Sequence, residues 1–147
     1  MRYLARATLF LLAAMLLTAC ARNSDSIPFV TVAQGDQTGI REDEVLLFTE
    51  PEAWEAHWRS HAAVNPEPAR PPVDFSTESV LAIYLGEKST TGHAVEVTRI
   101  ARGDDRLKVA VKMTFPGRRN GAGISRAFHI VRFPKVPPDT VLEVTWR

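Results

Sequence analysis

Residues 73–97 read VDFSTESVLAIYLGEKSTTGHAVEV, and two kinds of strand can be distinguished within them. Residues 80–85, VLAIYL, are apolar at every position, which is typical of a strand covered on both faces. After Gly92, Val95 and Val97 alternate with polar residues, the two-residue period of a strand with one face in water. Because a strand covered on both faces lies inside the molecule, we expect the other elements to be layered around residues 80–85.

Counting the strand that begins near Val95, six segments besides residues 80–85 have the patterns of strands, and most of them are short. They cover residues 27–33, 44–48, 95–101, 107–115, 126–133 and 140–146. Alternation is clearest in the fourth segment, whose side chains expected to point inward are Leu107, Val109, Val111, Met113 and Phe115. Because strands adjacent in sequence are joined by short turns, we expect a mainly antiparallel sheet of about seven strands, with a sandwich-like arrangement as one option.

One amphipathic helix is predicted after the strand at 44–48. Thr49 offers a hydroxyl that can cap the helix, Pro51 suits its first turn, and Glu52 stands at the capping-box position. The helix should run to about Ala62. Its stripe facing the sheet is formed by residues spaced four and three apart, Trp54, Trp58 and His61. The expected fold class is therefore α+β, with this helix packed on the sheet.

The composition describes one folded domain with little net charge. The chain has 147 residues, of which 45% are hydrophobic, enough for one core and too few for two ordinary domains. Its formal net charge is +1, and no basic stripe alternates with aromatic residues. We therefore expect no nucleic acid among its partners.

The first 20 residues have the pattern of a targeting segment. Arg2 and Arg6 precede an apolar stretch at 7–17, which is too short to cross a bilayer that requires about 20 helical residues. The stretch is followed by Thr-Ala-Cys, and Cys20 is the only cysteine of the chain. This ending resembles the lipobox of bacterial lipoproteins, which implies cleavage before Cys20 and attachment of fatty acids such as palmitate. The alternative is an ordinary secretory signal in which Cys20 is incidental.

These features divide the chain into three expected parts: a lipoprotein signal peptide at 1–19, a lipidated tether at 20–26 and a single globular domain at 27–147. The expected location is the cell envelope, where the acylated Cys20 attaches the protein to a membrane. Ala21 follows the cysteine, and by resemblance to enterobacterial sorting rules this favours the outer membrane or its periplasmic face.

Few residues have the pattern of a catalytic or metal-binding site. His57 and His61 have the i, i+4 spacing of a metal-binding pair, but no glutamate follows the first histidine, and the edge of an amphipathic helix explains them more simply. His93 and His129 lie on expected strands, where core or rim positions are the simplest interpretation. No serine stands in a Gly-x-Ser-x-Gly turn, and the acidic run at 42–44 is typical of a solvated turn. We expect no catalytic residue, no metal and no cofactor.

Two glycine-containing loops are the candidate contact surfaces. The first, residues 116–123, reads PGRRNGAG, and its Arg118 and Arg119 can offer paired donors to carboxylate or phosphate groups. The second loop, at 89–92, carries Thr90 and Thr91 and is followed by His93. The simpler interpretation of both loops is that they only make turns.

Several motifs of the mature chain resemble the C-terminal domain of PrcB-type proteins, subunits associated with a bacterial surface protease complex. The matching segments are GDQTGI at 35–40, the helix with Trp54 and Trp58, VDF at 73–75, residues 81–86, TTGH at 90–93 and FHIV at 128–131. Where the family usually reads Thr-Gly-Gly-Tyr, this chain has Thr91 for a glycine and His93 for the tyrosine.

The resemblance implies a small envelope domain that supports or binds another protein, and it carries over no catalytic residues. We therefore expect a lipid-anchored, non-catalytic accessory module with a protein partner. Two other functions remain open: a structural lipoprotein that binds cell-wall polymer, and a small hydrolase.

Overall fold

The computed structural model describes residues 26–64, 66–117 and 121–147; the expected signal peptide, Cys20, Arg118 and Arg119 lie outside the described residues. The described part contains one helix, α1 (Pro51–His61), and ten strands. The strands are β1 (Ser26–Ile27), β2 (Val30–Gly35), β3 (Asp43–Phe48), β4 (Glu78–Leu85), β5 (Lys88–Thr90), β6 (Ala94–Arg102), β7 (Arg106–Thr114), β8 (Ala122–Ser125), β9 (Phe128–Pro134) and β10 (Val141–Trp146).

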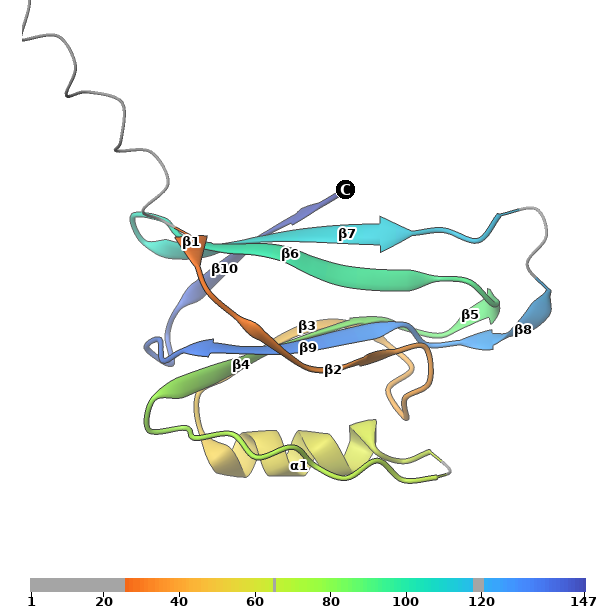
Figure 1. Cartoon of the computed structure of the whole chain (residues 1–147), viewed down its shortest axis with the longest axis horizontal. Coiled ribbons are helices and arrows are strands. Elements are labelled where there is room, and N and C mark those ends of the chain that lie inside the picture. The colour runs from red at the N-terminus through yellow and green to blue at the C-terminus, as the bar shows by residue number, and fades with distance from the viewer. Residues whose placement is uncertain (1–25, 65, 118–120) are drawn as a thin grey trace, which may run out of the picture.

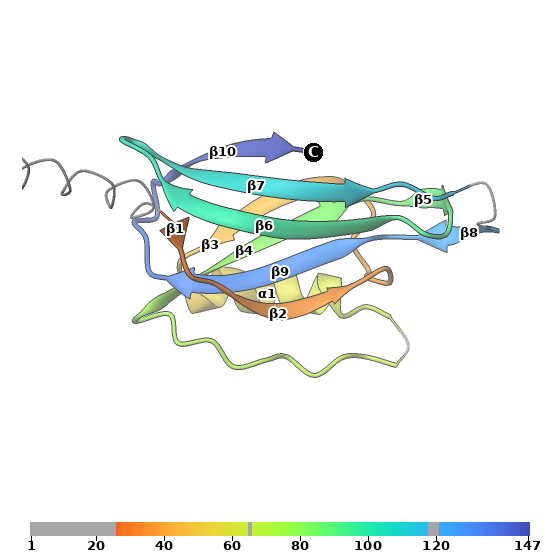
Figure 2. The ribbon, with the colours of Figure 1, turned by 45° about the horizontal axis from the view of Figure 1, so that its top comes forward.

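Two four-stranded sheets face each other, and the helix covers the outer side of one of them (Figures 1 and 2). Sheet A has the order β1-β6-β7-β10, sheet B has the order β2-β9-β4-β3, and β5 and β8 form a small separate ladder. All pairings are antiparallel except that of β7 with β10, which is parallel. The prediction of an α+β fold with mainly antiparallel sheets is confirmed, and the arrangement is sandwich-like.

Strand β4 separates two hydrophobic cores, as its apolar sequence predicts. Leu81 and Ile83 belong to the core between the sheets, whereas Val80, Ala82 and Tyr84 belong to the core beneath α1. All five side chains are almost completely buried. Since β4 also pairs with β3 on one side and with β9 on the other, it is covered in every direction.

The helix presents its predicted stripe to sheet B. Trp54, at 2% exposure, and Trp58, at 5%, lie 5.3 Å apart between ring centroids, and Trp54 meets Phe48 edge-on at 5.4 Å. His61, the third member of the stripe, is equally buried. Burial of these rings fixes the helix on the sheet, because large aromatic side chains remove much apolar surface from water.

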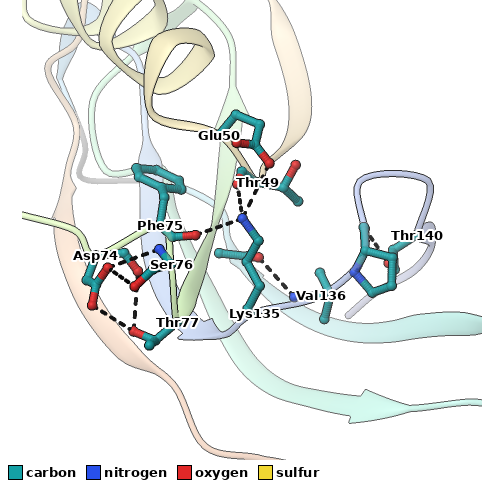
Figure 3. A network of polar contacts seen from close by, with 11 residues as sticks. Thr49, Glu50, Asp74, Phe75, Ser76, Thr77, Lys135, Val136 and Thr140 are labelled. Atoms are coloured by element: carbon teal, nitrogen blue, oxygen red, sulfur yellow. Dashed lines mark hydrogen bonds and ion pairs between the residues drawn. The ribbon is translucent and has the colours of Figure 1, made fainter.

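The predicted cap of the helix is wrong. The residue at the N-cap is Glu50, and its side chain makes no capping hydrogen bond. Thr49 is buried instead, and its carbonyl oxygen accepts a hydrogen bond from Lys135 Nζ, which also donates to the carbonyl of Phe75 at 2.7 Å (Figure 3). The lysine therefore ties the end of β9 to the start of α1 and to the loop before β4.

Three other expectations need correction. The strand predicted at 27–33 is two strands in different sheets, because Pro28 has no N–H for a ladder and the chain crosses from sheet A to sheet B around it. Phe115, predicted to point inward, is 67% exposed because β7 ends at Thr114. His93, expected on a strand, lies in the loop between β5 and β6.

Candidate functional site

The two loops predicted as separate contact surfaces meet in one place. Strand β5 pairs with β8, so that Lys88 lies opposite Ser125 and Thr90 opposite Ala122. The Ser125 hydroxyl donates to the Thr90 carbonyl at 2.7 Å. We call this end of the sandwich the tip, and define it as residues 88–93, 115–117 and 121–125 (Figure 1).

Side chains of the tip combine hydrogen-bonding groups with exposed apolar surface. Thr90 Oγ1 lies 2.9 Å from His93 Nε2, and the ring of His93 meets Phe115 edge-on at 6.3 Å between centroids. Phe115 and Ile124 are exposed by 67% and 55%. Aromatic residues such as Phe115 are enriched in protein–protein interfaces relative to the rest of a protein surface.

The two strands of the tip are held together closely. The Thr91 N–H donates to the Gly121 carbonyl at 3.3 Å. A Cβ atom at Gly123 would lie 2.8 Å from Thr91 Cγ2, so a larger residue there would have to displace the Thr91 side chain. Thr90, Thr91 and His93 are thus brought together with the described ends of the 116–123 loop, whereas Arg118 and Arg119 are not among the described residues.

A third segment, the turn at 35–40, joins the base of the tip. Gln37 Nε2 donates to the Ile124 carbonyl at 3.3 Å, and the Arg126 N–H donates to the Asp36 carbonyl at 2.7 Å. The Arg126 guanidinium reaches Glu87 Oε2 at 2.6 Å, and this hydrogen bond lowers the pKa of the Glu87 carboxyl below its usual value. Segments far apart in sequence therefore assemble at one end of the molecule.

The tip lies at the opposite end of the sandwich from the start of the described chain (Figures 1 and 2). Strand β6 begins with Ala94 beside the tip, and Ser26 of β1 pairs with Ala101 near the other end of the same strand. At about 3.3 Å per residue, Ala94 and Ala101 are roughly 23 Å apart along β6. The chain that leads to Cys20 consequently enters far from the tip.

The histidines of α1 belong to a buried hydrogen-bonded chain rather than to an open site. His57 Nε2 lies 3.0 Å from the Tyr84 hydroxyl, which lies 3.2 Å from His61 Nδ1, and His61 Nδ1 lies 3.0 Å from Thr38 Oγ1. Burial lowers the pKa of His61 to about 4 and also lowers the pKa of His57. Burial raises the pKa of the Tyr84 hydroxyl, so that Tyr84 remains protonated.

His129 occupies the core position that its strand pattern predicts. Its Nδ1 accepts a hydrogen bond from the Val97 N–H at 2.8 Å, and its Nε2 lies 2.9 Å from Thr31 Oγ1. Because Nδ1 accepts, the ring is neutral with its proton on Nε2, in agreement with the lowering of its pKa by burial. His129 therefore links β9 to β6 of sheet A and to its own neighbour β2 in sheet B.

Sequence reasoning missed Phe115 and Ile124 as surface residues. The signal for Phe115 was its place immediately before Pro116, since a proline ends the ladder and with it the alternation. Ile124 is a lone apolar residue between Gly123 and Ser125, and such a short segment has no period to interpret.

Within residues 26–64, 66–117 and 121–147, no three His, Cys, Asp or Glu side chains gather closely enough to hold a metal ion. Among the same residues, no helix has the length and apolar character needed to cross a membrane. Residues 79–122 match the family model of the PrcB C-terminal domain, which confirms the resemblance over β4 to β7 and most of the tip. No curated protein and no solved structure matches the chain.

Proposed function

We propose that this chain, whose residues 79–122 match the PrcB C-terminal family model, is a lipid-anchored accessory module of the bacterial cell envelope. It binds a protein partner through the tip and catalyses no reaction. The observation that carries the proposal is the convergence of three separate segments on a tip that exposes Phe115 and Ile124.

The anchor is the acylated Cys20. Residues 1–19 are removed as a signal peptide, and residues 20–26 connect the lipid to β1. Each methylene group buried in the bilayer contributes about 0.8 kcal/mol, so several acyl chains hold the protein firmly. Ala21 after the cysteine favours the outer membrane as the destination.

The tip supplies the contact chemistry. Phe115 and Ile124 are the apolar anchors, His93 lies beside Phe115, and Thr90, Thr91 and His93 supply the hydrogen-bonding groups of the tip. Arg118 and Arg119, which lie between β7 and β8 in the sequence, add charged donors. In protein–protein interfaces, a few central residues surrounded by polar contacts usually contribute most of the affinity.

Co-purification from detergent-solubilised membranes tests the proposal. We expect the wild-type protein to retain a protein partner, and we expect Phe115→Ser combined with Ile124→Ser to lose it while the melting temperature stays the same. Val141→Ser is the matched control, because Val141 is 57% exposed but lies on β10, outside the tip. Arg118→Ala with Arg119→Ala examines the charged part of the same loop.

Three outcomes would overturn the proposal. Equal recovery of the partner by the tip variant and the control would exclude the tip, and recovery of peptidoglycan in place of a protein would favour a cell-wall function. The anchor would be excluded if the wild-type protein carried no acyl label and appeared in the soluble fraction, as we expect the Cys20→Ser variant to do.

A further inference from the structure

The outer face of sheet A carries a groove with a surplus of positive charge. The groove has a volume of about 410 Å³, and four cationic side chains line it, those of Arg99, Arg102, Lys108 and Arg147. No other layer of the described chain covers this face, because α1 packs on sheet B at the far side of the molecule (Figure 1). The four cations therefore face solvent.

The carboxylates of this face are already engaged or lie outside the groove. Glu143, which also lines the groove, pairs with Arg106 at 3.6 Å, and Arg106 pairs in addition with Asp105 at 2.8 Å. Glu96 lies directly opposite Lys112 across the β6–β7 ladder.

Asp104 lies in the turn between β6 and β7, and Asp25 is outside the described residues. Among the described residues, no carboxylate lies within ion-pair distance of the four groove cations. Asp105 also attracts Lys108 electrostatically, and with Glu143 counted the groove keeps a surplus of positive charge.

The groove is next to the place where the tether joins the fold. Ser26 pairs with Ala101, and Ala101 itself lines the groove. The six residue-to-residue steps from Cys20 to Ser26 span at most about 22 Å when fully extended. A lipid on Cys20 would hold sheet A within that distance of the bilayer, and electrostatic attraction acts over about 8 Å at physiological ionic strength.

The geometry points to a membrane-docking face: the groove of sheet A binds the phosphate headgroups of anionic phospholipids in the leaflet that holds the lipid of Cys20. The arginines suit this ligand because a guanidinium group can donate two parallel hydrogen bonds to one phosphate. This inference rests on the proposed lipid anchor. It places sheet A against the membrane and leaves the helix layer and the tip accessible to a partner.

Vesicle sedimentation with the acyl-free chain 21–147 tests the inference independently of the anchor. This chain contains all residues of the two cores and every described strand, so it is the whole folded part. We expect it to bind vesicles that contain phosphatidylglycerol, to release them at high salt, and not to bind vesicles of phosphatidylcholine alone. Each basic side chain near an anionic surface raises the membrane-binding constant roughly fivefold. The double variant Arg99→Gln with Arg102→Gln should therefore bind about 25-fold more weakly.

The matched control removes the same charge elsewhere. Arg41→Gln with Arg59→Gln alters two exposed arginines that lie outside sheet A, and it should leave vesicle binding nearly unchanged. Equal weakening by the two double variants, equal binding to both kinds of vesicle, or no binding by the wild type would overturn the inference. Displacement by inorganic phosphate at constant ionic strength would show a site for free anions and would also overturn it. Failure here leaves partner recovery through the tip unaffected.

Discussion

Gly39 is the residue at which the turn at 35–40 closes on the end of α1. Its N–H donates to the His61 carbonyl at 3.0 Å, and the Thr38 hydroxyl donates to the same carbonyl at 3.1 Å. A Cβ atom at this position would lie 2.9 Å from Ala63 Cβ and far inside contact distance of the Ser60 carbonyl oxygen. The contact therefore requires a glycine. The turn supplies hydrogen-bond donors to a carbonyl at the end of α1, where carbonyl groups have no partner within the helix.

Gly39→Ala should lower the free energy of unfolding by about 2–3 kcal/mol, because the backbone of the turn must move away from the helix. Chemical denaturation measures the change. Gly117→Ala is the control, since a Cβ atom there meets nothing within 4 Å. Equal stability of the two variants would show that the turn does not press on the helix.

The buried histidines make stability depend on pH. His61 has a pKa of about 4 in the folded protein and about 6.5 when unfolded, so above pH 6.5 the ring is neutral in both states and its contribution is complete. As the pH falls below 6.5, the unfolded chain takes up a proton and the folded one does not, and stability is lost until about pH 4. His57 and His129 act in the same direction, because burial lowers their pKa values too.

We therefore expect the free energy of unfolding to fall by about 1 kcal/mol per pH unit for His61 alone between pH 6 and pH 5. Denaturation curves at several pH values provide the measurement. His61→Gln should have a smaller slope than the wild type over this interval. Stability that is independent of pH from 7 to 5 would contradict the assignment of neutral, buried histidines.

At the scale of elements, the helix is held mainly by its two tryptophans. Trp58→Ala should cost roughly 3–5 kcal/mol and strongly lower the melting temperature, because the substitution empties the space between α1 and sheet B. Trp146→Ala is the matched control, since Trp146 is 40% exposed at the edge of sheet A. A Trp58→Ala protein that melts like the wild type would mean that the helix stripe is not part of the core.

The sequence predicts those elements whose hydrophobic pattern is long enough to be recognised. Residues 80–85 are six apolar positions in succession, and the stripe of α1 repeats over two turns, so both are recognisable without a structure. β5 and β8 have three and four residues with glycine and hydroxyl side chains, and neither has a period. Their pairing joins residues about 35 positions apart, and only the packed sheets bring them together.

The same limit applies to the candidate site. Thr90, Thr91 and His93 could be proposed from the sequence because glycine and small polar residues mark a loop. The sequence could not show that this loop and the loop at 116–123 form one surface. Their proximity follows from the antiparallel pairing of β6 with β7. The basic groove of sheet A could not be predicted for a similar reason. Its cations come from β6, from β7 and from the residue that follows β10, and β10 joins β7 in parallel from a distant part of the chain.

At the scale of the whole molecule, the proposed function gives three surfaces separate tasks. Sheet A carries the chain toward Cys20 and the positive groove, the helix layer closes the second core, and the tip projects from the far end of the strands (Figure 2). Because Ser26 pairs near one end of β6 and the tip adjoins the other end, the proposed anchor would leave the tip free. This division of surfaces is what an anchored binding module requires.

Site-specific photo-crosslinking in living cells tests this account most directly. A crosslinking amino acid is placed at Ile124 and at Gly117 in the tip, and at Ala53 and Ala56 on the exposed side of α1 as controls. We predict a discrete crosslinked protein partner from Ile124 and Gly117 and none from the helix positions. Crosslinks from Ala53 or Ala56 alone, with none from the tip of the membrane-bound protein, would contradict it.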